Sequence, residues 1–155
     1  MRKIVIILST VFFLLLFEGC GKEKIVEKRL IYEATGTSEV LGVGMNVEKS
    51  VYPSNVSEIN VVWTNDTDKE YMFGEPFSIL KKEVEEWKPV GNSEAVFTSI
   101  GYPVAAHSQR KHKYNLRIFV DELERGEYQI VTSFLDVRAP GDYSSYKVST
   151  NFSVE

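Results

Sequence analysis

The stretch Trp63–Val90, WTNDTDKEYMFGEPFSILKKEVEEWKPV, decides the fold class of this chain. It predicts a strand, then a polar turn at Asn65–Asp68 whose short side chains can bond their own backbone, then an aromatic strand. A corner at Gly74–Pro76, another strand and an acidic hairpin turn at Glu83–Glu86 follow, and Trp87 then returns toward the core. Short strands joined by such turns are typical of antiparallel sheets.

From about Val40 onward, a two-residue period of apolar side chains dominates the sequence. The sequence predicts further strands with one apolar face each, a strand Phe97–Tyr102 ended by Pro103, and one helical turn at Asp121–Glu124. The residues predicted to share a face are Val43, Met45 and Val47; Ile59, Val61 and Trp63; Tyr114, Leu116 and Ile118; Tyr128, Ile130, Thr132 and Phe134; and Tyr146, Val148, Thr150, Phe152 and Val154, with Ser145, Lys147, Ser149, Asn151 and Ser153 outside. Seven to nine short strands without a long helix predict an all-β antiparallel β-sandwich.

The composition suits one globular domain with additional segments. The chain has 155 residues, of which 43% are hydrophobic and 12% aromatic, and its formal net charge is −4. A domain of this size buries enough surface for a core without metals or disulfides. Nucleic-acid binding needs a basic face, whereas lysines alternate with acidic residues here, as in Lys22–Lys24. We therefore expect no nucleic-acid partner.

The N-terminus has the pattern of a secretory signal. Arg2 and Lys3 precede an apolar or hydroxyl run, Ile4–Phe17, which is shorter than the roughly 20 residues that a membrane-spanning helix needs. The run ends close to Cys20, which is the only cysteine of the chain. Gly19–Cys20 resembles the lipobox of bacterial lipoproteins, where signal peptidase II cuts before a cysteine that carries diacylglycerol.

This resemblance implies an anchored protein on the extracytoplasmic face of the cell membrane. Phe17 and Glu18 depart from the usual lipobox residues, and a signal peptide cut elsewhere or an uncleaved anchor is the alternative. Two or three acyl chains make stable anchoring, whereas one is marginal. We divide the chain into a signal peptide (1–19), a lipidated cysteine with a charged tether (20–39) and a β-sandwich domain (40–155).

Several motifs of the domain, in this order and spacing, resemble those of bacterial immunoglobulin-like (Ig-like) domains of small secreted proteins and lipoproteins. They are Gly42–Met45, Thr64–Tyr71, Gly74–Ile79, Trp87 and Gly126–Val131, and the resemblance covers Gly42 to Phe134. The spacing of Leu123, Gly126 and Tyr128 also matches the tyrosine corner of Ig-like sandwiches, where the tyrosine bonds upstream backbone. The family implies an Ig-like sandwich and no common activity, so no catalytic role is transferred.

The residues that could carry chemistry form no recognisable constellation. His107 and His112 are five residues apart, so strand parity points them to different faces, and we expect a surface pair without metal. Asp66, Asp68 and Glu70 could hold calcium loosely, but the loop lacks the glycine and distal glutamate of an EF-hand. Nucleophile elbows, phosphate loops and zinc-protease motifs are absent from the sequence. We expect no enzyme, no cofactor and no metal site.

Partner binding is expected on two loops, Phe73–Pro76 and Tyr102–His107, since loops carry function in sandwiches. The candidate contact residues are Phe73, Glu75, Pro76, Tyr102 and Val104, with Met72 nearby. Tyr71, Phe73, Phe77 and Trp87 form the densest aromatic cluster, and filling the core is its expected role.

These observations favour a membrane-anchored bacterial lipoprotein that presents an Ig-like domain to an envelope protein. The alternative is a protease inhibitor, because the bacterial intracellular proteinase inhibitor family has a similar small sandwich with a comparable Gly-x-Tyr strand. An inhibitor needs an extended exposed loop, for which Gly74–Pro76 and Tyr102–Val104 are the short candidates. A spacer without a specific ligand is the third alternative.

Overall fold

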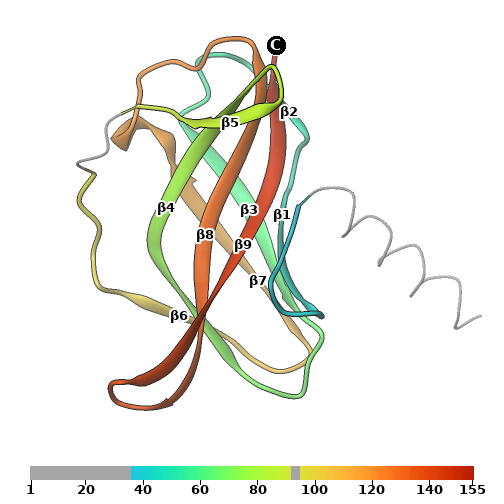
Figure 1. The fold of residues 1–155 in the computed structure, drawn as a ribbon, viewed down its shortest axis with the longest axis vertical. Helices are drawn as coiled ribbons and strands as arrows, with labels where there is room; N and C mark the ends of the chain where they lie inside the picture. Colours follow the sequence, from blue (N-terminus) through green and yellow to red (C-terminus); the bar gives the residue numbers. More distant parts are fainter. Residues whose placement is uncertain (1–35, 92–94) are drawn as a thin grey trace, which may run out of the picture.

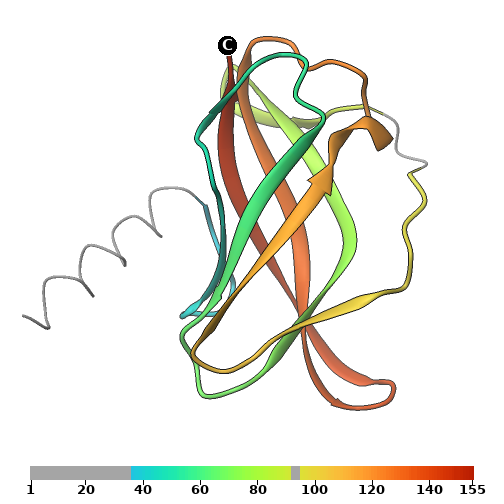
Figure 2. The same ribbon diagram turned by 180° about the vertical axis from the view of Figure 1, so that it is seen from behind.

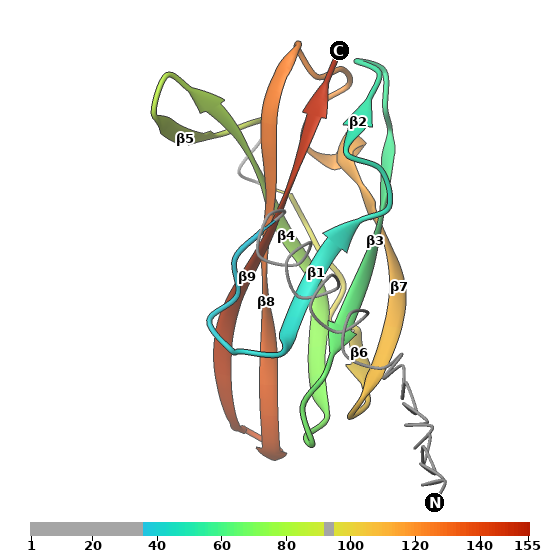
Figure 3. The ribbon, with the colours of Figure 1, turned by 90° about the vertical axis from the view of Figure 1, so that its right-hand side faces the viewer.

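Two β-sheets face each other in the computed structural model, which describes residues 36–91 and 95–155 (Figure 1). One sheet has the order β1–β3–β7; the other has the order β2–β9–β8–β4–β5, and β6 also pairs with β4. Figure 2 views the molecule from the side of β3 and β7, and Figure 3 shows the two layers side by side. The elements are β1 (Val43–Val47), β2 (Val51–Tyr52), β3 (Glu58–Asn65), β4 (Tyr71–Glu83), β5 (Glu86–Pro89), β6 (Gly101–Val104), β7 (Ser108–Asn115), the 3-10 helix η1 (Leu116–Ile118), β8 (Gly126–Ala139) and β9 (Asp142–Val154).

The core lies between the two sheets and follows the predicted alternation. In β8, Tyr128, Ile130, Thr132 and Phe134 are all buried, and their sequence neighbours face outward or are only half-buried. β3 contributes a run of fully buried alternating residues that ends at Trp63. Side chains two residues apart in a strand share a face, and burial of that face from water drives the two sheets together. The predicted all-β sandwich is confirmed.

A tyrosine corner closes the loop before β8. Tyr128 is buried, and its hydroxyl group donates a hydrogen bond of 2.6 Å to the carbonyl oxygen of Glu124. Leu123, one residue earlier, is buried and bonds through its amide to the carbonyl of Ser54. The corner predicted from the spacing of these residues is thus present, and it fixes where β8 starts.

The predicted corner at Gly74–Pro76 is a bulge inside a single strand. β4 runs through it from Tyr71 to Glu83, and its register with β8 shifts between Phe73 and Phe77. Pro76 has no amide hydrogen to donate, so regular pairing cannot continue there. The hydroxyl group of Thr132 in β8 instead donates to the carbonyl oxygen of Pro76 at 2.7 Å. The prediction of two separate strands is therefore wrong.

Three further predictions about local structure are wrong. Residues 97–100 form no strand, and Pro103 lies inside β6, where an edge position tolerates a missing donor. β7 ends at Asn115, whose side-chain oxygen accepts from the amide of Arg117 and starts η1, so Leu116 and Ile118 are not strand residues. Residues 121–124 are not helical.

Ser149 and Trp87 differ from their predicted burial. Ser149, expected outside, is buried because residues 37–39 lie along β9: the Ser149 amide donates to the carbonyl of Thr37, and the two hydroxyl groups are 2.9 Å apart. Trp87 is only half-buried and lies outside the hydrophobic core. The reason is that β5 pairs with the end of β4 in a hairpin that projects from the sandwich (Figure 3). Tyr71, Phe73 and Phe77 do fill the core as expected.

Candidate functional site

The two predicted contact stretches are neighbouring strands of one surface. β4 and β6 pair antiparallel, which places Phe73 opposite Tyr102 and Gly74 opposite Gly101. The sequence predicts these stretches as separate loops, because a pairing across about 28 residues leaves no local signal. The structure brings them together at the edge of the six-stranded sheet.

A half-buried polar cluster of Glu75, Tyr102 and Arg110 lies at the accessible edge of this surface, and we call it the edge cluster. The Tyr102 hydroxyl group donates a hydrogen bond to the Glu75 carboxylate, and this bond is the main reason that the pKa of Tyr102 is raised. The guanidinium carbon of Arg110 lies 5.2 Å from the centre of the Tyr102 ring, within cation–π range. Arg110 also donates to the carbonyl oxygen of Pro103 at 3.0 Å. All three side chains are therefore held in place.

Arg110 was missed by the sequence analysis, although a signal was present. In β7, Arg110, His112 and Tyr114 are two residues apart and therefore share the inward face of the strand. Counting back from the apolar Tyr114 would have placed Arg110 on the same side as the aromatic residues of β4 and β6.

The other predicted contact residues divide between the core and the surface. Phe73 and Val104 are buried in the core, so these two predicted contact residues are not accessible to a partner. Pro76 is exposed on the opposite face of the sheet from the core. Glu75 and Tyr102 are half-buried and remain accessible at the edge.

His112 lies behind the edge cluster and packs against aromatic rings. Its ring centre is 4.9 Å from that of Tyr102 and 5.0 Å from that of Phe73. Its Nε2 atom is buried and has no hydrogen-bond partner among the described residues. Burial lowers the pKa of His112 below its usual 6.5, and the nearby Glu75 carboxylate offsets this only in part. The expected surface pair is therefore not formed: His112 is half-buried against aromatic rings, and this burial disfavours its charged form.

The lowered pKa of His112 predicts a pH-dependent stability. The unfolded chain binds a proton at this histidine near pH 6.5, whereas the folded chain binds it only at lower pH. The free energy of unfolding should therefore decrease as the pH falls below about 6.5, down to the lower pKa of the folded state. Urea titrations between pH 5 and 7.5 measure this slope, and His112→Phe should reduce it. An unchanged slope in that variant would contradict the assignment.

The second histidine and the acidic turn meet at the molecular surface. His107 lies in the β6–β7 turn, and its Nε2 atom is 2.8 Å from Oδ1 of Asp68. Both side chains are highly exposed, so the pair contributes little to stability. Among residues 36–91 and 95–155, no group of three or more histidine, cysteine, aspartate or glutamate side chains could hold a metal ion.

Asn65 connects the end of β3 to the end of β6 through side-chain hydrogen bonds. It is fully buried at the end of β3, and its amide nitrogen is 2.6–3.0 Å from the carbonyl oxygens of Lys69, Val104 and Ala105. Its side-chain oxygen accepts from the amide and the hydroxyl group of Thr67. Asn65 thereby holds the β3–β4 turn and the end of β6 in one position.

The predicted lipidation and cleavage residues, Gly19 and Cys20, lie outside the described residues. Within the part of the chain that the structure describes, no helix is long and apolar enough to cross a membrane.

Comparison with known proteins gives one family. A family model described as a bacterial Ig-like domain matches residues 39–153. The crystal structure of the PmoD soluble domain from Methylocystis sp. ATCC 49242 (Rockwell) is similar over 73% of this chain and 90% of that chain, with 12% identity and a TM-score of 0.35. No curated protein matches the chain.

Proposed function

The chain belongs to the bacterial Ig-like domain family, and from this premise we propose that it is a lipid-anchored lipoprotein whose domain binds a protein of the cell envelope through the edge cluster. The family is typically non-catalytic, which suits a binding or accessory role. The N-terminal pattern that ends in Cys20 supports a lipid anchor on the extracytoplasmic face of the membrane.

The observation that carries the proposed binding role is the ordering of the edge cluster. Tyrosine and arginine are enriched among the residues that dominate protein interfaces. Tyr102 and Arg110 are each held by a partner before any binding, so little side-chain entropy is lost when a complex forms. Ile100, exposed by 52% and directly before β6, adds apolar area beside them.

The protease-inhibitor alternative receives no such support from the fold. Gly74–Pro76 is a bulge within β4, and Tyr102–Val104 belongs to β6, so neither stretch projects as a loop that could enter an active-site cleft. The spacer alternative differs from the proposal in requiring no partner at all, and the following experiment separates the two.

Site-specific photo-crosslinking in cells tests the binding role. A photo-reactive residue replaces Ile100 beside the edge cluster, and a control carries it at Val84, which is 92% exposed at the β4–β5 turn. We expect one dominant crosslinked envelope protein from position 100 and none from position 84, and Tyr102→Ala should abolish that crosslink. Absence of a specific product at position 100 would favour a spacer. A captured protease that the soluble domain inhibits would favour the alternative.

Lipid attachment is tested at Cys20. Cys20→Ser removes the only thiol of the chain, so incorporation of labelled fatty acid should fall to background and the protein should leave the membrane fraction. Ser9→Ala, within the apolar run, is the matched control and should retain labelling. Unchanged labelling of Cys20→Ser would rule out the lipid anchor while leaving the binding role of the domain open to the crosslinking test.

A further inference from the structure

The bulge in β4 opens a groove on the face of the six-stranded sheet that points away from the core. The groove has a volume of about 570 Å³, within the range of small-molecule sites. It exists because three residues of β4, at positions 74–76, lie between the pairs Phe73–Phe134 and Phe77–Thr132 and so face Ser133 alone in β8. Phe77 and Thr132, which otherwise belong to the core, reach its lining for the same reason.

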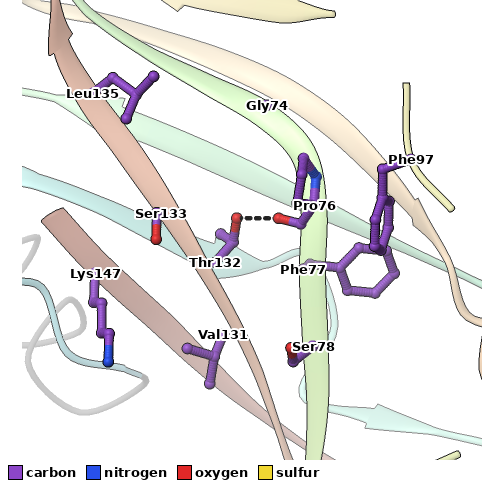
Figure 4. Close-up of a pocket in the computed structure, with 10 residues that line it drawn as sticks. All are labelled: Gly74, Pro76, Phe77, Ser78, Phe97, Val131, Thr132, Ser133, Leu135 and Lys147. Atoms are coloured by element: carbon purple, nitrogen blue, oxygen red, sulfur yellow. Dashed lines mark hydrogen bonds between the residues drawn. The ribbon is translucent and has the colours of Figure 1, made fainter. Parts of the chain in front are cut away.

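Apolar and polar side chains both line the groove, and the apolar Leu135 lies on the same side as Ser133 and Lys147 (Figure 4). Pro76 and Phe97 lie on one side, and Ser133 and Lys147 lie on the other, with Thr132 between them. The hydroxyl group of Thr132 donates to the Pro76 carbonyl oxygen, so this hydroxyl group is already satisfied. The full lining is Gly74, Pro76, Phe77, Ser78, Phe97, Val131, Thr132, Ser133, Leu135 and Lys147.

The only charge in this lining is a cation. Lys147 is exposed and lies directly opposite Ser133 across the β8–β9 pair. No ion pair among residues 36–91 and 95–155 includes its ammonium group. The carboxylate of Glu39 accepts a hydrogen bond from the backbone amide of Lys147 at 2.6 Å. Among the described residues, nothing pairs with this ammonium group, and it lies at the end of the groove.

We propose that this groove is a binding site for an anionic amphiphile, meaning a small molecule with an apolar ring or chain and one acidic group. The apolar part would lie against Pro76, Phe97 and Leu135, where its burial from water supplies most of the binding free energy. The acidic group would lie at Lys147, with the hydroxyl group of Ser133 as a hydrogen-bond donor. The site is separate from the edge cluster and does not depend on the proposed protein partner.

Two fluorescent probes that differ in one charge test the proposal. The first, 1-anilinonaphthalene-8-sulfonate, carries a sulfonate, and the second, N-phenyl-1-naphthylamine, is its uncharged parent. The folded domain should bind the anionic probe saturably and more tightly than the neutral one. Amide shifts in NMR spectra on probe addition should be centred on Ser78, Val131, Ser133 and Lys147.

Three variants distinguish the contribution of the Lys147 charge to probe binding from the contribution of the groove itself. Lys147→Gln should lower the affinity of the domain for the anionic probe about three- to fivefold, which is the effect of one exposed charge pair. The affinity for the neutral probe should not change. Lys113→Gln, the matched loss of an exposed strand lysine on the other sheet, should change neither. Ser133→Phe places a large side chain in the groove from an exposed position and should lower the affinity for both probes. Circular dichroism checks that the sandwich of this variant is folded.

Three results would overturn the proposal. The first is the absence of saturable binding of either probe. The second is binding whose NMR shifts centre away from the groove. The third is an affinity for the anionic probe that neither Lys147→Gln nor Ser133→Phe changes.

Discussion

Asn65→Asp is expected to lower the free energy of unfolding by about 3–5 kcal/mol at neutral pH, although the two side chains have nearly the same shape. The substitution keeps the oxygen that accepts from Thr67. It replaces the amide nitrogen by a carboxylate oxygen that faces the carbonyl oxygens of Val104 and Ala105 within the buried end of β6. A buried charge is thus surrounded by acceptors, and urea denaturation measures the loss.

The matched control for this prediction is Asn151→Asp. Asn151 is exposed, and its side-chain oxygen accepts a hydrogen bond from Gln129, which aspartate can also accept. We expect a change within about 0.5 kcal/mol. A loss of less than about 1 kcal/mol for Asn65→Asp would show that the amide does not hold the three carbonyl groups. Because Asn65 positions the end of β6, the crosslink at position 100 should also weaken in this variant.

Trp63→Ala is expected to lower the free energy of unfolding by about 3–5 kcal/mol. Trp63 is fully buried, stacks on Phe73 at 4.3 Å between ring centres, and meets Phe134 edge-on at 6.2 Å. Removal of its ring leaves a cavity between the two sheets and also ends these ring contacts. Trp63→Phe keeps a ring on Phe73 and should cost less, about 1–2 kcal/mol.

Trp87→Ala is the control, because it makes the same substitution at a position outside the core. It removes the same side chain at a half-buried position outside the core, so the loss should be about 1 kcal/mol. Chemical denaturation followed by far-ultraviolet circular dichroism suits all three variants, because it does not depend on either tryptophan. Equal losses for Trp63→Ala and Trp87→Ala would contradict the placement of Trp63 in the core.

The sequence predicted the features that local patterns determine. The alternation Tyr128, Ile130, Thr132, Phe134 specified both the strand and its buried face, because one residue of slippage would turn every apolar side chain to water. The tyrosine corner was predictable for the same reason, since Tyr128 and Glu124 are neighbours in the chain.

What the sequence did not predict depends on distant partners. The pairing of β4 with β6 joins two stretches that had been considered separately, and it turns Phe73 and Val104 inward while leaving Glu75 and Tyr102 accessible. Ser149 fits the polar side of its strand by pattern and is buried only because residues 37–39 cover it. The β4 bulge, and with it the groove, arises from the missing amide hydrogen of Pro76 together with a hydroxyl group supplied by another strand.

The contact of residues 37–39 with β9 has a mechanical consequence. A pull on the chain upstream of Gly36 would load first the few hydrogen bonds that join Thr37 to Ser149 and Glu39 to Lys147. Their rupture would free the segment from Gly36 to Leu41, while the bond from the Asp66 amide to the Gly42 carbonyl oxygen and the pairing of β1 with β3, from Val43 onward, stay intact. At about 3.3–3.6 Å per extended residue, this release adds on the order of 20 Å of reach. Under tension, this short segment would therefore extend before the force acts on the strands of the sandwich.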